Sequence, residues 1–294
     1  MDNLIVKLFT DSVKQRLGDG YEVSTTTVLK NNDTRLTGII IKESGTNIFP
    51  TIYLDDLAEA YQDGYSLDYC IDKILQLYEG HKCTTSFDTS DFLSFSSIKD
   101  RIYFTLVNTN KNKERLLSIP HLEIMDLSII FKVLVNSNQL GTASVTVCDS
   151  LLDSWNITAK ELYSIALANA ERLFPSQISS MCEILSGAGV LTPAGLHIPM
   201  YVLSNINKQE GASCILYEDV LKNFSRKICS SLYILPSSTH EVILLPANDS
   251  PMENDLLTMV KEVNATEVRE DEILSDNVYF YSLETNKITP LNYI

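Results

Sequence analysis

The sequence predicts an α+β fold with mixed, largely antiparallel sheets and packed helices, arranged in two subdomains. Apolar residues recur at helical spacing in some segments and alternate as in strands in others. These segments do not show the regular alternation of strands and helices that is typical of a doubly wound parallel sheet. A chain of 294 residues is long for one hydrophobic core, and 45% hydrophobic with 21% charged residues is typical of globular proteins.

The first part of the chain predicts a helix, a hairpin and two more helices. Gly18 and Gly20 end the first helix, and Asn31-Asn32-Asp33 suits a turn because Asn and Asp tolerate turn dihedrals. Pro50 indicates an edge strand or a bulge, and Ser66 is a suitable N-cap. The expected elements are a helix over 4–17, strands over 21–27, 35–42 and 48–54, and helices over 55–62 and 66–80.

A polar segment rich in Thr, Ser and Asp, residues 82–91, is the best candidate linker. It predicts an N-terminal subdomain over 1–92 and a C-terminal domain over 93–294. The sequence leaves open whether this segment separates two folding units or crosses one.

The clearest element of the second part is a helix that starts at the capping box of Thr158 and Glu161 and ends before Pro175. Asn136-Ser137-Asn138 and Gly141 predict a hairpin turn. The expected elements are helices over 96–107, 113–117, 179–185, 216–228 and 256–263, and strands over 126–135, 142–147, 200–203, 232–235, 242–245 and finally 278–281, with a closing turn near Asn286.

The charge argues against a nucleic-acid or membrane protein. The net charge is −15 and the isoelectric point is about 4.6, so most of the surface repels phosphate groups. A local cluster of basic residues is interpreted as a solvated helical face: Lys99, Arg101, Lys111, Lys113 and Arg115. We expect an unknown, basic protein partner, no direct nucleic acid and no membrane.

The localisation expected from the sequence is cytoplasmic. Residues 1–17 are too charged for a signal peptide, and the longest apolar candidate, 124–135, is broken by Asp126 and Lys132. The six cysteines are scattered without a C-x-x-C pair, as in a reducing compartment.

Motifs for metals and cofactors are missing, so neither is expected. His240-Glu241 begins like H-E-x-x-H, but Leu244 stands where the second His belongs. The spacing of Cys70, His81 and Cys83 matches no structural zinc site. Gly187-Ala188-Gly189 lacks the third glycine of a dinucleotide-binding loop.

The candidate catalytic residues gather around one loop. Ser237, Ser238, His240 and Glu241 have the residue types needed for acyl transfer, but adjacent residues in a tight loop cannot easily hydrogen-bond in series. We interpret the loop as a hairpin turn. The alternative is a hydrolase or other small-molecule enzyme with its site near His240 and Glu241, helped by Ser238, His121 and Asp126.

An acidic segment near the C-terminus is the candidate binding surface. It contains Glu267, Glu270, Asp271, Glu272 and Asp276. The simplest interpretation is a solvated loop, and the functional one is a contact surface for a basic partner.

The run Ser230 to Pro246, SSLYILPSSTHEVILLP, resembles the signature of a bacterial family of unknown function. That family is common in Gram-positive gut anaerobes and their mobile genetic elements. Further blocks agree with it: 52–55, 99–102, 107–108, 120–121, 126–127, 155–175, 200–205, 211–212, 263–266 and 274–276. The resemblance covers nearly the whole chain and implies no activity. Residues 142–281 are also similar to a second uncharacterised family of intracellular bacterial proteins, which implies a compact C-terminal α+β unit.

Together these observations predict a non-enzymatic, acidic interaction protein, an adaptor or inhibitor that covers a basic surface of its partner. The hydrolase near His240 and Glu241 is the alternative. A third possibility is a module that binds a peptide by strand addition at an exposed edge near Pro50. The identity of the partner or substrate and the oligomeric state stay open.

Overall fold

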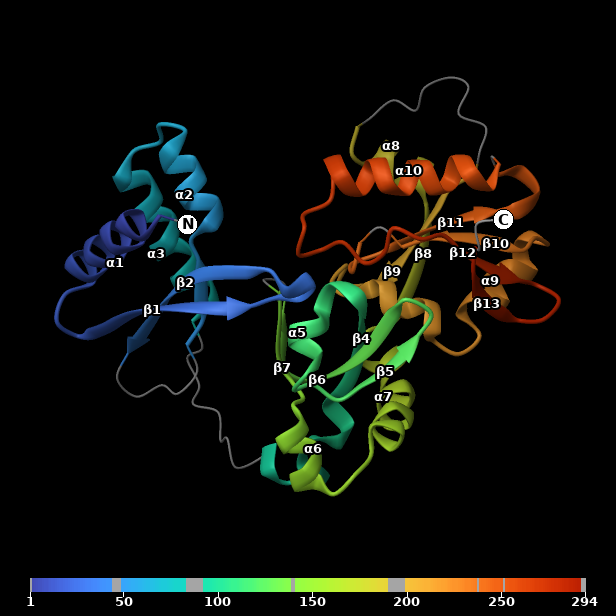
Figure 1. The fold of residues 1–294 in the computed structure, drawn as a ribbon, viewed down its shortest axis with the longest axis horizontal. Coiled ribbons are helices and arrows are strands. Elements are labelled where there is room, and N and C mark those ends of the chain that lie inside the picture. The colour runs from blue at the N-terminus through green and yellow to red at the C-terminus, as the bar shows by residue number, and fades with distance from the viewer. Residues whose placement is uncertain are drawn as a thin grey trace. The chain divides into compact units, whose positions relative to one another are not determined.

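The computed structural model describes residues 2–43, 49–82, 92–138, 141–189, 199–236, 238–250 and 252–291 (Figure 1). It confirms an α+β fold with antiparallel sheets. Contacts divide the chain into two compact units, one of residues 1–30 and 34–91 and one of residues 31–33 and 92–294. Whether the segments 1–92 and 93–294 fold independently stays a prediction, and the expected linker 82–91 lies outside the described residues except for Lys82.

The first unit is a three-stranded antiparallel sheet, in the order β1-β2-β3, with three helices. Asp2 caps the first helix, and Arg16 near its end bonds to Asp68 and Asp72, each at 2.9 Å. The core contains Phe9, Ile39, Ile41, Leu54, Ile71 and Ile74. The elements are α1 (Asn3–Leu17), β1 (Tyr21–Leu29), β2 (Arg35–Glu43), β3 (Thr51–Tyr53), α2 (Asp55–Gln62) and α3 (Leu67–His81).

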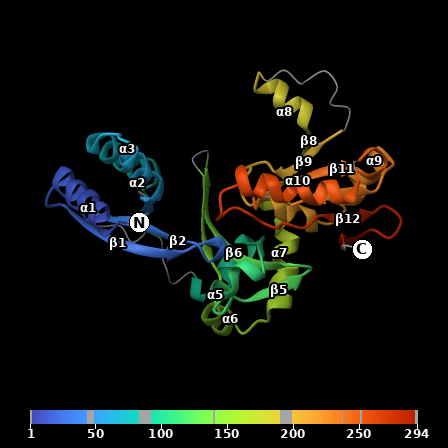
Figure 2. The same ribbon diagram turned by 45° about the horizontal axis from the view of Figure 1, so that its top comes forward.

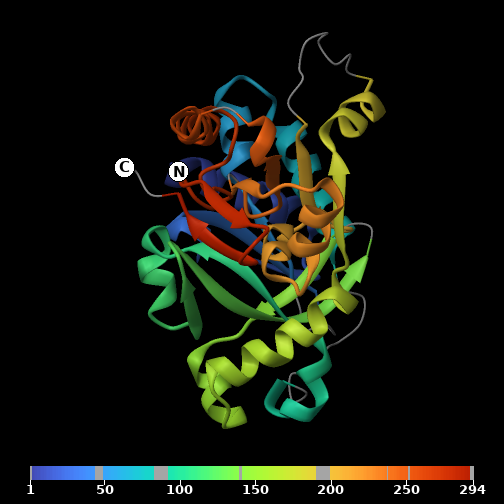
Figure 3. The ribbon, with the colours of Figure 1, turned by 90° about the vertical axis from the view of Figure 1, so that its right-hand side faces the viewer.

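The second unit contains a four-stranded sheet built around the long strand β6. Strand β4 pairs with one side of β6, while β5 and β7 pair with the other side in succession. Helix α7 lies against β4, and the two can be followed in Figure 3. The elements are α4 (Phe95–Ile98), η3 (Lys99–Arg101), β4 (Ile102–Asn108), η4 (Asn110–Asn112), α5 (Lys113–Leu116), β5 (His121–Ile124), β6 (Leu127–Asn138), β7 (Gly141–Thr146), α6 (Asp149–Trp155) and α7 (Ala159–Leu173).

A six-stranded antiparallel sheet completes this unit, in the order β13-β12-β10-β11-β9-β8. Helix α10 covers one face of this sheet (Figure 2). Leu256, Leu257 and Val260 of α10 belong to one buried cluster with Leu235 and Leu245. The remaining elements are β8 (Ser176–Ser180), α8 (Met181–Gly187), β9 (Tyr201–Asn205), η5 (Gly211–Leu216), α9 (Val220–Ile228), β10 (Leu232–Leu235), β11 (Val242–Pro246), η6 (Ala247–Asp249), α10 (Glu253–Thr266), β12 (Tyr279–Ser282) and β13 (Lys287–Pro290).

One core joins the two sheets of the second unit. Phe104 of β4 packs edge-on against Tyr163 of α7 and Tyr217 after η5. The same cluster continues to Leu203 and Leu244 of the six-stranded sheet. Consequently the residues that connect the two sheets are mostly buried, and the polar groups among them need partners.

Several predicted elements are confirmed and others are wrong. The hairpin 21–43 and the capping box of α7 occur as expected. The hairpin 126–147 also forms, but residues 136–138 and Gly141, which were expected in its turn, belong to the paired ends of β6 and β7. The helix expected over 96–107 is instead a short helix followed by β4, in which every residue is buried. Strands β5, β8 and β13 were not expected, so 278–281 is not the last strand.

Among the residues that the structure describes, no helix is both long enough and apolar enough to cross a membrane.

Candidate functional site

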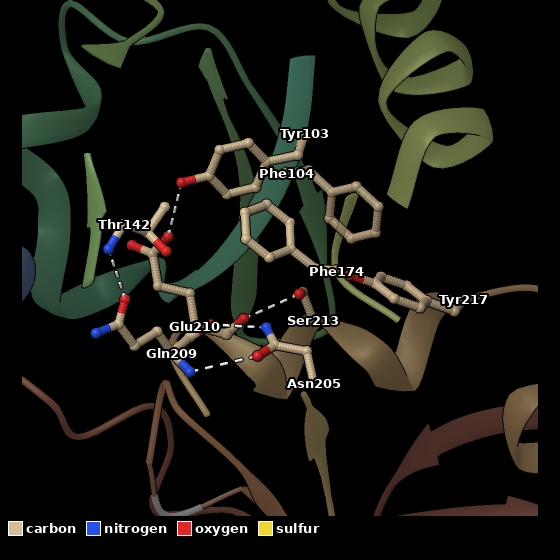
Figure 4. Close-up of a pocket in the computed structure, with 9 residues that line it drawn as sticks. All are labelled: Tyr103, Phe104, Thr142, Phe174, Asn205, Gln209, Glu210, Ser213 and Tyr217. Carbon is tan, nitrogen blue, oxygen red and sulfur yellow. Dashed lines mark hydrogen bonds between the residues drawn. The ribbon is translucent and has the colours of Figure 1, made fainter. Parts of the chain in front are cut away.

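A small pocket of the second unit lies where the segment before η5 meets β4 (Figure 4). Its volume is about 10 Å³, the space of a single water molecule. The lining residues are Tyr103, Phe104, Thr142, Phe174, Asn205, Gln209, Glu210, Ser213 and Tyr217. In this conformation the pocket is too small for an organic substrate.

The polar wall of the pocket is built by the turn between β9 and η5. The side chain of Asn205 closes this turn, since its Nδ2 donates to the Gln209 carbonyl at 2.7 Å and its Oδ1 accepts from Asn207 N–H at 3.0 Å. Glu210 has a left-handed backbone, with φ of 54°. Ser213 Oγ donates to the Glu210 carbonyl at 3.0 Å and so fixes the start of η5.

Glu210 is the electrostatic centre of the site. Its carboxylate accepts a hydrogen bond from Tyr103 Oη at 3.2 Å and forms an ion pair with Lys132 of β6. Burial raises the pKa of Glu210, but the charge and hydrogen bond of Lys132, with Tyr103 and Arg115, outweigh it and hold this pKa below its usual range. Burial, reinforced by Glu210, raises the pKa of Tyr103. The Glu210 carboxylate is therefore ionised at neutral pH and already paired.

The thiol next to this pocket is not an activated nucleophile. Cys214 is fully buried, and burial raises its pKa to about 12. Because the thiolate is the reactive form, Cys214 is inert at neutral pH.

The structure brings His240 together with two glutamates. Its Nδ1 accepts the backbone N–H of Glu210 at 3.2 Å, and its Nε2 lies 3.5 Å from Glu272 Oε1. The bond to Nδ1 requires an unprotonated nitrogen, so the ring proton sits on Nε2, facing Glu272. Through its two ring nitrogens, His240 therefore contacts Glu210 on one side and Glu272 on the other.

Ser238 does not face the imidazole ring as a nucleophile would. Its hydroxyl oxygen accepts the backbone N–H of His240 at 3.0 Å, as in a local turn. Glu241 is half-buried and lies directly before β11. Ser237 lies outside the described residues.

The other two candidates lie in the four-stranded sheet. His121 starts β5, where its Nδ1 lies 2.8 Å from the Ile119 carbonyl. Asp126 follows Met125, whose φ is 58°, in the turn between β5 and β6, and it accepts from Ser275 Oγ and Tyr279 Oη, both at 2.6 Å. Asp126 thus anchors the segment after α10.

The five acidic residues expected at a binding surface occupy that segment. Glu267 and Glu270 are exposed. Asp271 pairs with Arg269 at 3.2 Å, Glu272 faces His240, and Asp276 lies 3.4 Å from Lys111. Two carboxylates therefore point to solvent, and three are partly balanced by neighbours.

Sequence reasoning missed Glu210, Lys132 and Tyr103. They come from a turn and two strands, 107 positions apart in the widest pair, and no local motif marks them. Within the described ranges, no group of three or more His, Cys, Asp and Glu side chains is placed to hold a metal ion.

The fold and site define a protein of two α+β units whose polar residues join its sheets and hold an acidic segment in place. The chain belongs to the family of unknown function DUF5688, which matches residues 4–283. No curated protein and no solved structure matches it.

Proposed function

We propose that the protein acts by binding a basic surface of a partner protein, and that the contact is the acidic segment, defined here as residues 267–276. One observation carries this proposal: the segment is held in a fixed conformation while Glu267 and Glu270 remain exposed. A binding surface that is already ordered loses less conformational entropy when its partner arrives.

The backbone of the acidic segment is held by a neighbouring loop and by a turn within the segment itself. Thr239 N–H donates to the Glu272 carbonyl at 2.8 Å, and Ser238 forms a β-bridge with Ile273. The amides of Glu272 and Ile273 both donate to the Arg269 carbonyl, which makes a tight internal turn. The loop that carries His240 thus supports the acidic segment.

The end of the segment is fixed by side chains. Asn264 is buried and donates to Asp276 Oδ1 at 2.8 Å and to the Ser275 carbonyl at 2.9 Å. Ser275 and Tyr279 then bind Asp126. These contacts connect the segment to both sheets of the second unit.

The overall charge supports the same partner. A net charge of −15 attracts a basic protein over a distance and speeds its encounter, while the ordered carboxylates orient it. Such a surface fits an adaptor or an inhibitor that covers a basic, nucleic-acid-binding face. Asp271 and Asp276, being paired, contribute less than Glu267 and Glu270.

A titration with a fluorescent arginine-rich peptide tests the proposal, with a neutral peptide of equal length as the control ligand. We expect Glu267→Gln/Glu270→Gln to weaken binding about fivefold to thirtyfold, since exposed charge pairs contribute roughly 0.5–1 kcal/mol each. Raising the salt concentration from about 50 to about 300 mM should weaken peptide binding by the wild-type protein. It should also reduce the difference in affinity between the wild-type protein and the double variant.

The matched control is Asp11→Asn/Asp19→Asn, which makes the same charge change at exposed positions of the first unit. Equal weakening by the two double variants would show general attraction by net charge and contradict a site at the acidic segment. Salt-insensitive binding would contradict the electrostatic mechanism.

A further inference from the structure

Among the outer edge strands of the described sheets, β8 and β13 carry features that hinder pairing with a further strand. In β8, the backbone N–H groups of Ser176 and Ser180 donate to the side chains of Glu171 at 3.1 Å and Glu183 at 3.3 Å. Strand β13 contains Lys287 and ends at Pro290, which has no N–H. Strand β4 is an edge strand of the four-stranded sheet, and all its residues are buried.

Strand β1 is different. It has nine residues, and within the described part of the first unit only β2 pairs with it. Its register with β2 runs without a bulge from Tyr21 opposite Glu43 to Leu29 opposite Arg35. The strand contains neither proline nor lysine, and its sequence YEVSTTTVL is rich in the β-branched residues that favour sheets.

The ladder shows which backbone groups of β1 point away from β2. Lys30 N–H donates to the Thr34 carbonyl at 2.8 Å, across the turn of the hairpin. Hydrogen-bonded and non-bonded pairs alternate along an antiparallel ladder, so the even-numbered residues of β1 bond to β2. The backbone groups of the odd-numbered residues, Tyr21 to Leu29, face outward, and the side chains of Thr25 and Thr27 are exposed.

We infer that the outer edge of β1 is a pairing site for the same strand of a second copy of this chain, in an antiparallel arrangement centred on Thr25. This register places Thr25 opposite Thr25, Val23 opposite Thr27 and Tyr21 opposite Leu29. Threonine pairs and β-branched pairs are favourable cross-strand neighbours. The outward groups of both strands are then used, and the two sheets become one continuous sheet.

Charge favours a second copy over a basic peptide at this edge. In β1 the charged residue is Glu22, which the register places opposite Val28 and which already pairs with Lys42 at 3.0 Å. Across β1 and β2 the charges balance, with Glu22 and Glu43 against Arg35 and Lys42. The edge is therefore locally neutral, although the whole chain is acidic.

Salt separates this inference from the proposed function, on which it does not depend. Two chains of charge −15 repel each other, and salt screens that repulsion, so the dimer strengthens as salt rises. Binding of a basic partner weakens under the same change. The dimer can therefore be disproved without contradicting the binding of a basic partner, and the reverse also holds.

Sedimentation velocity of the full chain tests the dimer. We expect a Kd on the order of 100 µM, because edge pairing buries less area than a standard interface, and a tighter value at higher salt. Thr25→Pro removes an outward N–H without touching the bonds to β2 and abolishes the dimer, while Thr25→Val keeps it. Where Thr25→Pro does not fold, Thr25→Lys gives the same loss by placing two ammonium groups opposite each other.

Cross-linking tests the register. Thr25→Cys places two thiols across the two-fold axis, with Cα atoms about 5.5 Å apart, within the range of a disulfide. Thr27→Cys places its thiol opposite Val23. Mild oxidation should therefore cross-link two copies of the Thr25→Cys variant through residue 25 but should not cross-link the Thr27→Cys variant, and mass spectrometry identifies the linked residues. Three results would overturn the inference. The first is a monomer at every salt and protein concentration, the second is a monomer that binds only a strand peptide, and the third is equal cross-linking of the two cysteine variants.

Discussion

The Tyr279 hydroxyl donates to Asp126 Oδ1 at 2.6 Å and thereby ties β12 of the six-stranded sheet to the turn between β5 and β6 of the four-stranded sheet. Ser275 Oγ donates to the other carboxylate oxygen at 2.6 Å. Asp126 was a candidate for catalysis in the sequence. Its two oxygens instead hold the end of the acidic segment.

Removing this hydroxyl should destabilise the fold. Tyr279 is fully buried, so Tyr279→Phe leaves Asp126 with one strong donor fewer in a poorly solvated place. We expect the free energy of unfolding in urea to fall by about 1–3 kcal/mol. Tyr281→Phe is the control, because the hydrogen bond of that hydroxyl is local, to Asn286 at 3.0 Å. Equal losses in the two variants would contradict a special role for the bond to Asp126.

The buried tyrosines should make the protein sensitive to alkali. Burial raises the pKa of Tyr103, Tyr217 and Tyr279, with Glu210, Cys214 and Asp126 respectively adding to it. A folded-state pKa above the unfolded value of about 10 means that their stabilising effect is complete below pH 10 and is lost as the pH rises further. Absorbance at about 295 nm should therefore show a group of tyrosines that ionises together with the loss of circular dichroism. Complete ionisation in a still-folded protein would contradict this.

The pair of Glu210 and Lys132 should behave as a partly buried ion pair. Their side chains are 29% and 14% exposed, so Glu210→Gln leaves the ammonium poorly solvated and without its counter-charge. We expect a loss of about 1–3 kcal/mol in the free energy of unfolding at pH 7, and a smaller loss for Lys132→Met/Glu210→Gln than the two single losses combined.

The same pair predicts a dependence on acid. The pKa of Glu210 is lowered in the folded state, so its contribution is present above the unfolded value of about 4.3 and is lost as the pH falls through the lower, folded pKa. Denaturation series between about pH 3 and 7 should show a shallower decline for Glu210→Gln than for wild type. Parallel curves would show that Glu210 is not coupled to folding.

The sequence predicts well where the signal is local. Thr158 and Glu161 form the expected capping box, and the Asn31-Asn32-Asp33 turn closes the first hairpin. Strand β4 fails for a physical reason. Residues 102–108 are buried on both faces, so their sequence does not alternate between apolar and polar residues, and periodicity alone does not distinguish such a segment from a buried helix.

The site could be predicted only in fragments. His240 was selected, but its partners Glu210 and Glu272 lie about thirty positions away on either side, and folding alone brings them to the ring. The polar strand β8 was missed because its pairing with β9, rather than its own sequence, makes it a strand. Contacts of this kind are set by tertiary structure, which a single sequence does not display.

Gly211 offers a test of how closely the loop at His240 packs on the start of η5. A Cβ at this position would overlap Ser204 Oγ and would lie 2.6 Å from the amide nitrogen of Asn205 and 2.7 Å from the His240 carbonyl oxygen. Two of these atoms belong to the backbone, so they cannot move without shifting β9 or the loop. Gly211→Ala should therefore lower the free energy of unfolding by about 1–3 kcal/mol, as overpacking does. The control is Gly20→Ala, where a Cβ would meet no described atom within 4 Å.

Because the loop supports the acidic segment through Thr239 and Glu272, Gly211→Ala should also speed amide hydrogen exchange over residues 267–276. Unchanged exchange in a destabilised variant would show that the segment is held without the loop.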